Sequence, residues 1–131
     1  MDLKKAFGTN KALENEGAWV ELGDGASVKV ARLGNKLNAD LIKKLIKPHK
    51  VALRNDRLPD DVMEKITIEA MATTLLLDWK GIEDDGKPVP YTKENAVRLL
   101  TEYKDFRDQI SAFSNELAIF QTSSEAAAIK N

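Results

Sequence analysis

The chain has 131 residues, no cysteine, 31% charged residues and a formal net charge of −1 at pH 7. This length suffices for a hydrophobic core without metal or disulfide support, and the missing cysteines exclude a disulfide framework, a thiol nucleophile and a cysteine zinc site. The longest apolar run, from Ala70 to Leu77, is much shorter than the roughly 20 residues of a membrane span. We therefore expect no membrane partner.

Charge is distributed unevenly along the chain. Residues 29–57 carry a net charge of +7, whereas residues 1–28 carry −2 and residues 58–131 carry −6. Two interpretations stay open: the basic segment is a surface for an acidic partner, or it folds against the acidic C-terminal half.

The basic segment also raises a nucleic-acid hypothesis, because phosphate contacts need clustered cations. Lys43, Lys44, Lys47 and Lys50 would lie close together if one helix reached Lys50. However, the pI is about 5.9 and no aromatic residue stands among these lysines to stack on bases. We therefore expect nucleic acid not to be the partner.

The N-terminal part predicts a β-hairpin. Apolar residues alternate over 18–22 and 26–33, and Asp24-Gly25 between them is a strong short-range hairpin signal. Because two strands alone are marginally stable in water, a helix should cover their apolar face, and Trp19 should be an anchor.

The middle of the chain predicts two helices. Asn38 has the side chain of an N-cap, and Pro48 should end the helix that follows it. Residues 51–53 have the pattern of a short extended connection. Pro59 should begin the second helix, which we expect to run to about Trp79. Its second half is apolar on nearly every side, which is typical either of a core helix or of a partner surface.

A segment of turns and prolines, residues 81–91, separates this helix from the next one, and we call it the joint. Gly81 should end the helix with a positive φ, and residues 83–86 have the pattern of a tight turn. Pro88 and Pro90 should hold the chain extended, because proline fixes its own φ and restricts the residue before it. Thr92 should then be the N-cap of the last helical segment.

Metal and catalytic motifs do not fit this sequence. The acidic turn lacks calcium-loop spacing, since Gly81 and Thr92 stand where acidic ligands should be. The only histidine, His49, has no positioned partner nearby in the sequence, and no phosphate-cradling glycine motif or nucleophile elbow is present. We expect no metal, no cofactor and no enzymatic activity.

Beyond Thr92, apolar residues recur at helical spacing, with a possible break near Lys104. The second part of this segment forms a narrow stripe typical of a helix that packs lengthwise on another helix. The stripe consists of Phe106, Ile110, Phe113, Leu117 and Phe120. It belongs either to the core or to a seam for self-association or client binding, and we predict these five as partner-binding residues.

The joint carries an ordered motif, Trp-x-Gly-Ile-x-Asp-x-x-Gly-x-Pro-x-Pro-Tyr-Thr-x-Glu-Asn-Ala, which starts at Trp79. With upstream segments at 16–20, 28–33 and 35–36, it resembles the tail assembly chaperones of long-tailed, siphovirus-type bacteriophages. The resemblance runs from about Phe7 to about Phe120. Its structural motif residues are Trp19, Trp79, Gly81, Pro88, Pro90, Tyr91 and Asn95.

This resemblance implies a non-catalytic assembly factor. Such chaperones bind the long, helical, aggregation-prone tape measure protein in the cytoplasm of the infected bacterium and are absent from the mature virion. It also implies the tail tube protein and a frameshift-extended form of the chain as further partners. An alternative is a structural neck or tail component of the virion.

The expected fold class is α+β, mainly α-helical, with an N-terminal β-hairpin packed against about four helices. We expect a single domain over residues 1–120 and a mobile C-terminal tail over residues 121–131, where the apolar pattern ends. The helical stripe is compatible with a homo-oligomer as well as with an intramolecular helical hairpin.

Overall fold

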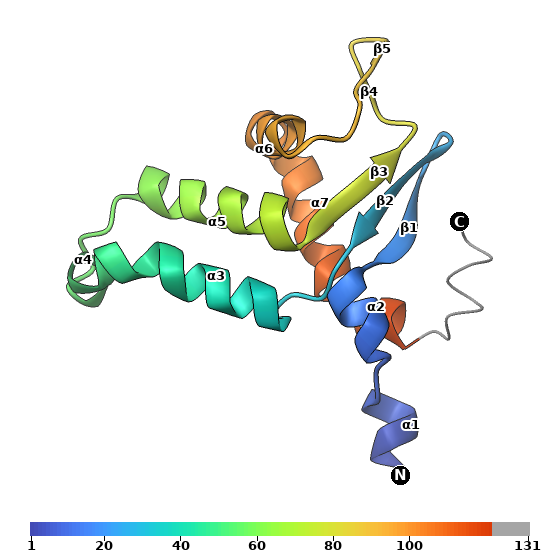
Figure 1. Cartoon of the computed structure of the whole chain (residues 1–131), viewed down its shortest axis with the longest axis horizontal. Helices are drawn as coiled ribbons and strands as arrows, with labels where there is room; N and C mark the ends of the chain where they lie inside the picture. The colour runs from blue at the N-terminus through green and yellow to red at the C-terminus, as the bar shows by residue number, and fades with distance from the viewer. Residues whose placement is uncertain (122–131) are drawn as a thin grey trace.

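The computed structural model describes residues 1–121 and has the predicted α+β, mainly α-helical class (Figure 1). Its α-helices are α1 (Leu3–Phe7), α2 (Lys11–Glu16), α3 (Lys36–Ile46), α4 (Lys50–Arg54), α5 (Asp60–Thr74), α6 (Lys93–Glu102) and α7 (Lys104–Ser114). Two 3-10 helices are η1 (Lys47–His49) and η2 (Leu117–Phe120). The strands are β1 (Ala18–Gly23), β2 (Ala26–Val30), β3 (Leu76–Lys80), β4 (Glu83–Asp84) and β5 (Lys87–Pro88).

The predicted tail, 121–131, lies outside the described residues except for its first member. The Gln121 side chain donates a hydrogen bond to the Ala6 carbonyl of α1 (2.9 Å).

A three-stranded antiparallel sheet in the order β1-β2-β3 forms the centre of the body. The predicted hairpin is confirmed, and Asp24 and Gly25 make its turn with φ of 53° and 77°. Val28 of the middle strand pairs with Val20 on one side and with Trp79 on the other. The apolar face formed in this way belongs to the core, where α7 packs on β2 and η2 packs on β1.

Trp19 lies on the opposite face of the sheet, because successive strand residues point to opposite faces and Ala18 is buried in the core. It is half-buried, and the ammonium of Lys80 lies 4.2 Å from the centre of its ring. Trp19 is therefore held by a cation–π contact between strands and not by the helices over the core.

The prediction of a helix that continues to Trp79 is wrong. Helix α5 ends at Thr74, and the chain passes through Leu75 into β3. The free edge of β2 offers hydrogen bonds to this segment, and the Ala31 amide donates to the Leu75 carbonyl (2.8 Å). A third strand makes the marginal hairpin stable, which outweighs the helix propensity of the leucines. Leu75 and Leu76 are buried, so the apolar run belongs to the core.

Gly81 has the predicted positive φ, at +70°, but it ends a strand and not a helix. A Cβ atom there would lie 2.5 Å from the Gly25 backbone oxygen, whereas a Cβ at Gly86, at φ +75°, would meet open space. Gly86→Ala should lower the free energy of unfolding by about 1–2 kcal/mol, the cost of the left-handed conformation alone. Gly81→Ala should cost more, and denaturant titration of both variants checks this. Equal losses of unfolding free energy in the two variants would show that the backbone around residue 81 shifts enough to remove the clash with the Gly25 oxygen.

The rest of the joint follows the prediction. Asp85 and Gly86, at φ of 53° and 75°, form the turn between β4 and β5, and residues 87–88 are extended. Thr92 is the N-cap of α6, since its hydroxyl accepts a hydrogen bond from the Asn95 amide (3.0 Å). The predicted break near Lys104 is confirmed by the non-helical Tyr103, which separates α6 from α7.

Two predictions for the middle of the chain are wrong. The N-cap of α3 is Asn35, three residues before the predicted Asn38. Asn38 is buried instead, where it donates to the Thr74 hydroxyl (2.9 Å) and accepts from the Gly34 amide (3.0 Å). Residues 51–53 are not extended but belong to α4, because the turn after α3 stays helical.

Helices α3 and α5 lie side by side and project from the sheet, with α4 at their far end (Figure 1). We call residues 36–74 the arm. Its two long helices are held together by the buried Asn38–Thr74 hydrogen bond at the sheet end and by half-buried aliphatic residues of α3 along its length.

Candidate functional site

The predicted partner-binding stripe lies mainly in the core. Ile110 and Phe120 are fully buried, while Phe106, Phe113 and Leu117 are half-buried. The reason is that α7 and η2 close over the apolar face of the sheet. The burial of these side chains agrees with the alternative in which the stripe belongs to the core. A partner could reach Ile110 or Phe120 only if α7 and η2 left the sheet. Phe106 lines an open groove.

The residues of the chaperone-like motif tie the joint to β3. The Trp79 indole donates to the Val89 carbonyl (2.7 Å), and its ring meets Tyr91 edge-on at 4.9 Å between ring centres. The Tyr91 hydroxyl donates to the Leu76 carbonyl (2.7 Å), and burial raises the pKa of this tyrosine. The Asn95 amide donates to the Pro90 carbonyl (2.9 Å). These contacts give the motif a structural role.

The remaining motif residues lie elsewhere. Gly81 is at the end of β3, Pro88 is exposed on β5, and Trp19 is on the outer face of the sheet. The structure therefore brings together Trp79, Tyr91, Pro90 and Asn95, but not the whole predicted set.

A groove of about 450 Å³ lies between the joint and the α6–α7 break. We call it the acidic groove, because carboxylates stand around an apolar floor. Its lining residues are Leu22, Ile82, Glu83, Asp84, Asp85, Leu99, Tyr103, Asp105 and Phe106.

Asp84 is the one carboxylate of the acidic groove with ion-pair and hydrogen-bond partners among the described side chains. It accepts hydrogen bonds from the Tyr103 hydroxyl (2.5 Å) and from the Arg98 guanidinium (2.9 Å), which hold the pKa of Asp84 below its usual range. The other three, Glu83, Asp85 and Asp105, are exposed and form no ion pair with any residue in 1–121. The groove therefore keeps a negative rim.

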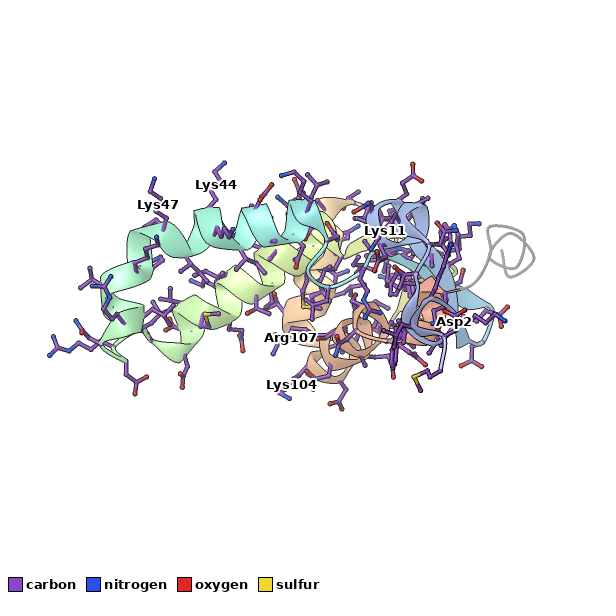
Figure 2. All side chains as sticks on the ribbon, turned by 90° about the horizontal axis from the view of Figure 1, so that it is seen from below. Asp2, Lys11, Lys44, Lys47, Lys104 and Arg107 are labelled. Atoms are coloured by element: carbon purple, nitrogen blue, oxygen red, sulfur yellow. The ribbon has the colours of Figure 1, made fainter. Side chains whose placement is uncertain are left out.

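A second groove, of about 620 Å³, lies on the arm. Its floor is aliphatic and its rim is basic, and we call it the lysine groove. It is lined by Ile42, Lys43, Lys44, Ile46, Lys47 and Lys50. Lys44 and Lys47 point to the same side, away from α5 (Figure 2). The nearly continuous helical path through α3, η1 and α4 brings the four lysines together, as the sequence predicts for a helix that reaches Lys50.

The basic segment is not neutralised within the described part of the chain. Its ion pairs are Arg32 with Glu14 (4.0 Å) and Lys36 with Asp40 (3.0 Å), and no ion pair within residues 1–121 joins it to the acidic C-terminal half. Six exposed cations of the basic segment have no carboxylate partner there: Lys43, Lys44, Lys47, Lys50, Arg54 and Arg57. Within residues 1–121 the segment is thus not joined to the acidic C-terminal half by ion pairs.

A family model described as YdaY prophage protein matches residues 33–131. The chain belongs to this family. It is therefore a phage-derived protein. Comparisons with curated proteins and with solved structures gave no match.

The YdaY match covers the arm, the joint, α6 and α7, and thus the lysine groove completely. It covers the acidic groove except for Leu22, which comes from β1. The family description names a prophage protein and no tail-assembly role.

Neither groove holds a recognisable metal site. Within residues 1–121 no cluster of three or more histidine, aspartate or glutamate side chains could hold a metal ion. Among the same residues, no helix has the length and apolar character needed to span a bilayer.

Sequence reasoning did not single out the acidic groove as a site. The acidic run 83–85 next to Ile82 is a signal, but the sequence pattern predicts only a tight turn there and does not fit a calcium loop. Leu22 and Tyr103 complete the groove from distant parts of the chain, and no local pattern links them to that turn.

Proposed function

We propose that this prophage protein is a non-catalytic tail assembly chaperone that binds the tape measure protein. It would act in the cytoplasm of the infected bacterium and be absent from the mature virion. Two lines of support are the motif that begins at Trp79, which resembles the linker of such chaperones, and the phage-derived family. The same resemblance supports the tail tube protein and a frameshift-extended form of this chain as further partners.

The lysine groove is the observation that carries this proposal. Ile42 and Ile46 offer an aliphatic floor, and the surrounding lysines have no carboxylate partner within residues 1–121. An amphipathic client helix could place its apolar stripe on this floor and its acidic residues beside the lysines, which is the helix-in-groove mode of recognition. The charges would mainly speed the encounter and select acidic clients. This surface replaces the core stripe as the proposed client site.

Co-expression with the tape measure protein tests the proposal. The soluble fraction of that client should rise when this chain is present, and the two proteins should co-purify. Lys44→Glu/Lys47→Glu should reduce the co-purified client at least about tenfold, because like charges across an interface cost several kcal/mol. Both side chains are exposed, so the fold should survive.

A matched control changes the net charge equally at a distant place. Lys4→Glu/Lys5→Glu alters exposed residues of α1 and should leave client binding unchanged. If the client stays insoluble even with the frameshift-extended form, the structural neck or tail component becomes the better proposal. Mass spectrometry of purified virions would then detect this chain in the particle.

Nucleic-acid binding is a second candidate, favoured by the single observation that four lysines line one groove. The floor of that groove is aliphatic, so it offers no stacking platform for bases. Retarded migration of a DNA fragment at low salt, lost as salt rises, would support this candidate. No retardation at low salt would reject it.

A further inference from the structure

The tip of the arm exposes apolar side chains among cations. Val51 and Leu53 of α4 are 66% and 45% exposed. Lys50 and Arg54 stand beside them on α4 and Arg57 follows; all three are exposed and pair with no carboxylate of residues 1–121. The exposed carboxylates Asp56, Asp60 and Asp61 stand after α4, in the turn and at the start of α5. Helix α4 itself thus carries an exposed apolar pair, two cations and no carboxylate, a composition that suits an acidic, partly apolar partner.

The acidic groove has the complementary composition. Leu22, Ile82 and Phe106 form a half-buried apolar floor. Glu83, Asp85 and Asp105 surround it with three carboxylates that are exposed and free of ion pairs with the described residues. Its rim is thus opposite in charge to helix α4.

The two surfaces cannot meet within one molecule. Helix α4 lies at the far end of the arm, whereas the β4–β5 turn projects from another corner of the body (Figure 1). We infer that the occupant of the acidic groove is the arm tip of a second copy of this chain. Val51 and Leu53 would cover the apolar floor, and Lys50, Arg54 and Arg57 would approach the three carboxylates.

This contact joins two different surfaces, so it is heterologous. Each copy that docks its arm still has an empty acidic groove, and association continues until a ring closes or a filament grows. The inference does not depend on client binding, since it concerns the chain alone. Lys50 belongs to both surfaces, but the client test changes Lys44 and Lys47, which the inference does not use.

The test compares the wild-type chain with variants that lose one surface each. In sedimentation velocity at low salt, the wild-type mass should rise above the 14.6 kDa monomer as concentration increases. It should return to the monomer at about 1 M salt, where the Debye length is only ~3 Å. Lys50→Glu/Arg54→Glu removes the basic tip, and Glu83→Lys/Asp105→Lys removes the acidic rim. Each should weaken association at least tenfold, and each changes exposed residues, so circular dichroism should show a native fold.

A fourth sample combines the tip variant, Lys50→Glu/Arg54→Glu, with the groove variant, Glu83→Lys/Asp105→Lys, and decides whether the two surfaces bind each other. In an equimolar mixture, the tip variant keeps a working groove and the groove variant keeps a working tip. This mixture should form a one-to-one complex of twice the monomer mass and nothing larger. Lys4→Glu/Lys5→Glu is the control and should assemble like the wild type.

Several results would overturn the inference. A wild-type chain that is monomeric at every concentration rejects it, as does a folded tip or groove variant that assembles normally. A mixture that stays monomeric would show that these surfaces do not dock on each other. Loss of assembly in the α1 control would show that net charge alone governs association.

Discussion

Replacing Phe120 with alanine should lower the free energy of unfolding by about 3–5 kcal/mol, the range for truncating a buried aromatic side chain. Phe120 is fully buried, and the Arg32 guanidinium carbon lies 5.3 Å from the centre of its ring. The Phe120 carbonyl also accepts a hydrogen bond from the Asn10 amide (2.8 Å), which connects η2 to the start of α2. Denaturant titration followed by circular dichroism measures the loss.

Phe7→Ala is the matched control, because it makes the same chemical change at a phenylalanine that is 59% exposed. It should change the free energy of unfolding by no more than about 0.5 kcal/mol. If Phe120→Ala costs as little as this control, the stripe that ends at Phe120 is not part of the core in solution. The stripe would then be available to a partner, as the sequence pattern suggested.

Local signals made several features of the fold predictable. Asp24-Gly25 and Asp85-Gly86 supply the positive φ values that their two turns require, and Thr92 supplies the hydroxyl of a helix N-cap. In each case the residues that determine the structure are neighbours in the sequence. The hairpin, the turn in the joint and the start of α6 therefore agree with the prediction.

Features that depend on distant residues were not predictable in the same way. Leu76 begins a strand because β2 has a free edge, and Val30 of that strand is far away in the sequence. Asn35 and Asn38 are both good N-cap residues, but only the structure shows that Thr74 of α5 gives Asn38 a buried partner. The helical stripe belongs to the core for the same reason, since the sheet that it covers is formed by other segments.

The candidate site also combines features that neighbouring residues predict with features that depend on distant residues. The sequence alone identifies the basic segment 29–57 and its four clustered lysines, and the structure places these lysines around one groove. Whether acidic residues neutralise the segment is a question of three-dimensional arrangement. Within residues 1–121 they do not, and the acidic groove lies at a different part of the molecule from the arm tip. The charges counted along the sequence predict that basic and acidic segments are separate. They do not predict whether the two neutralise each other in the folded chain.

Trp79→Ala should also lower the free energy of unfolding by about 3–5 kcal/mol, because Trp79 is 5% exposed and packs in the core. It connects β3 with the joint through the Val89 carbonyl and the edge of the Tyr91 ring. Trp19→Ala is the control on the outer face of the sheet, where the ring is half-buried, and it should cost clearly less. If both variants lose the same unfolding free energy, the contacts of Trp79 with the joint add no stability beyond that of a half-buried tryptophan.

Trp79→Phe separates packing from hydrogen bonding. It keeps an aromatic ring but leaves the Val89 carbonyl without its indole donor, and we expect a cost of about 1–3 kcal/mol. Because Trp79 lies in neither groove, a folded Trp79→Phe variant should bind the tape measure protein like the wild type. Loss of binding in that stable variant would indicate that the motif itself takes part in recognition, whereas normal binding would assign it to holding the joint against the sheet.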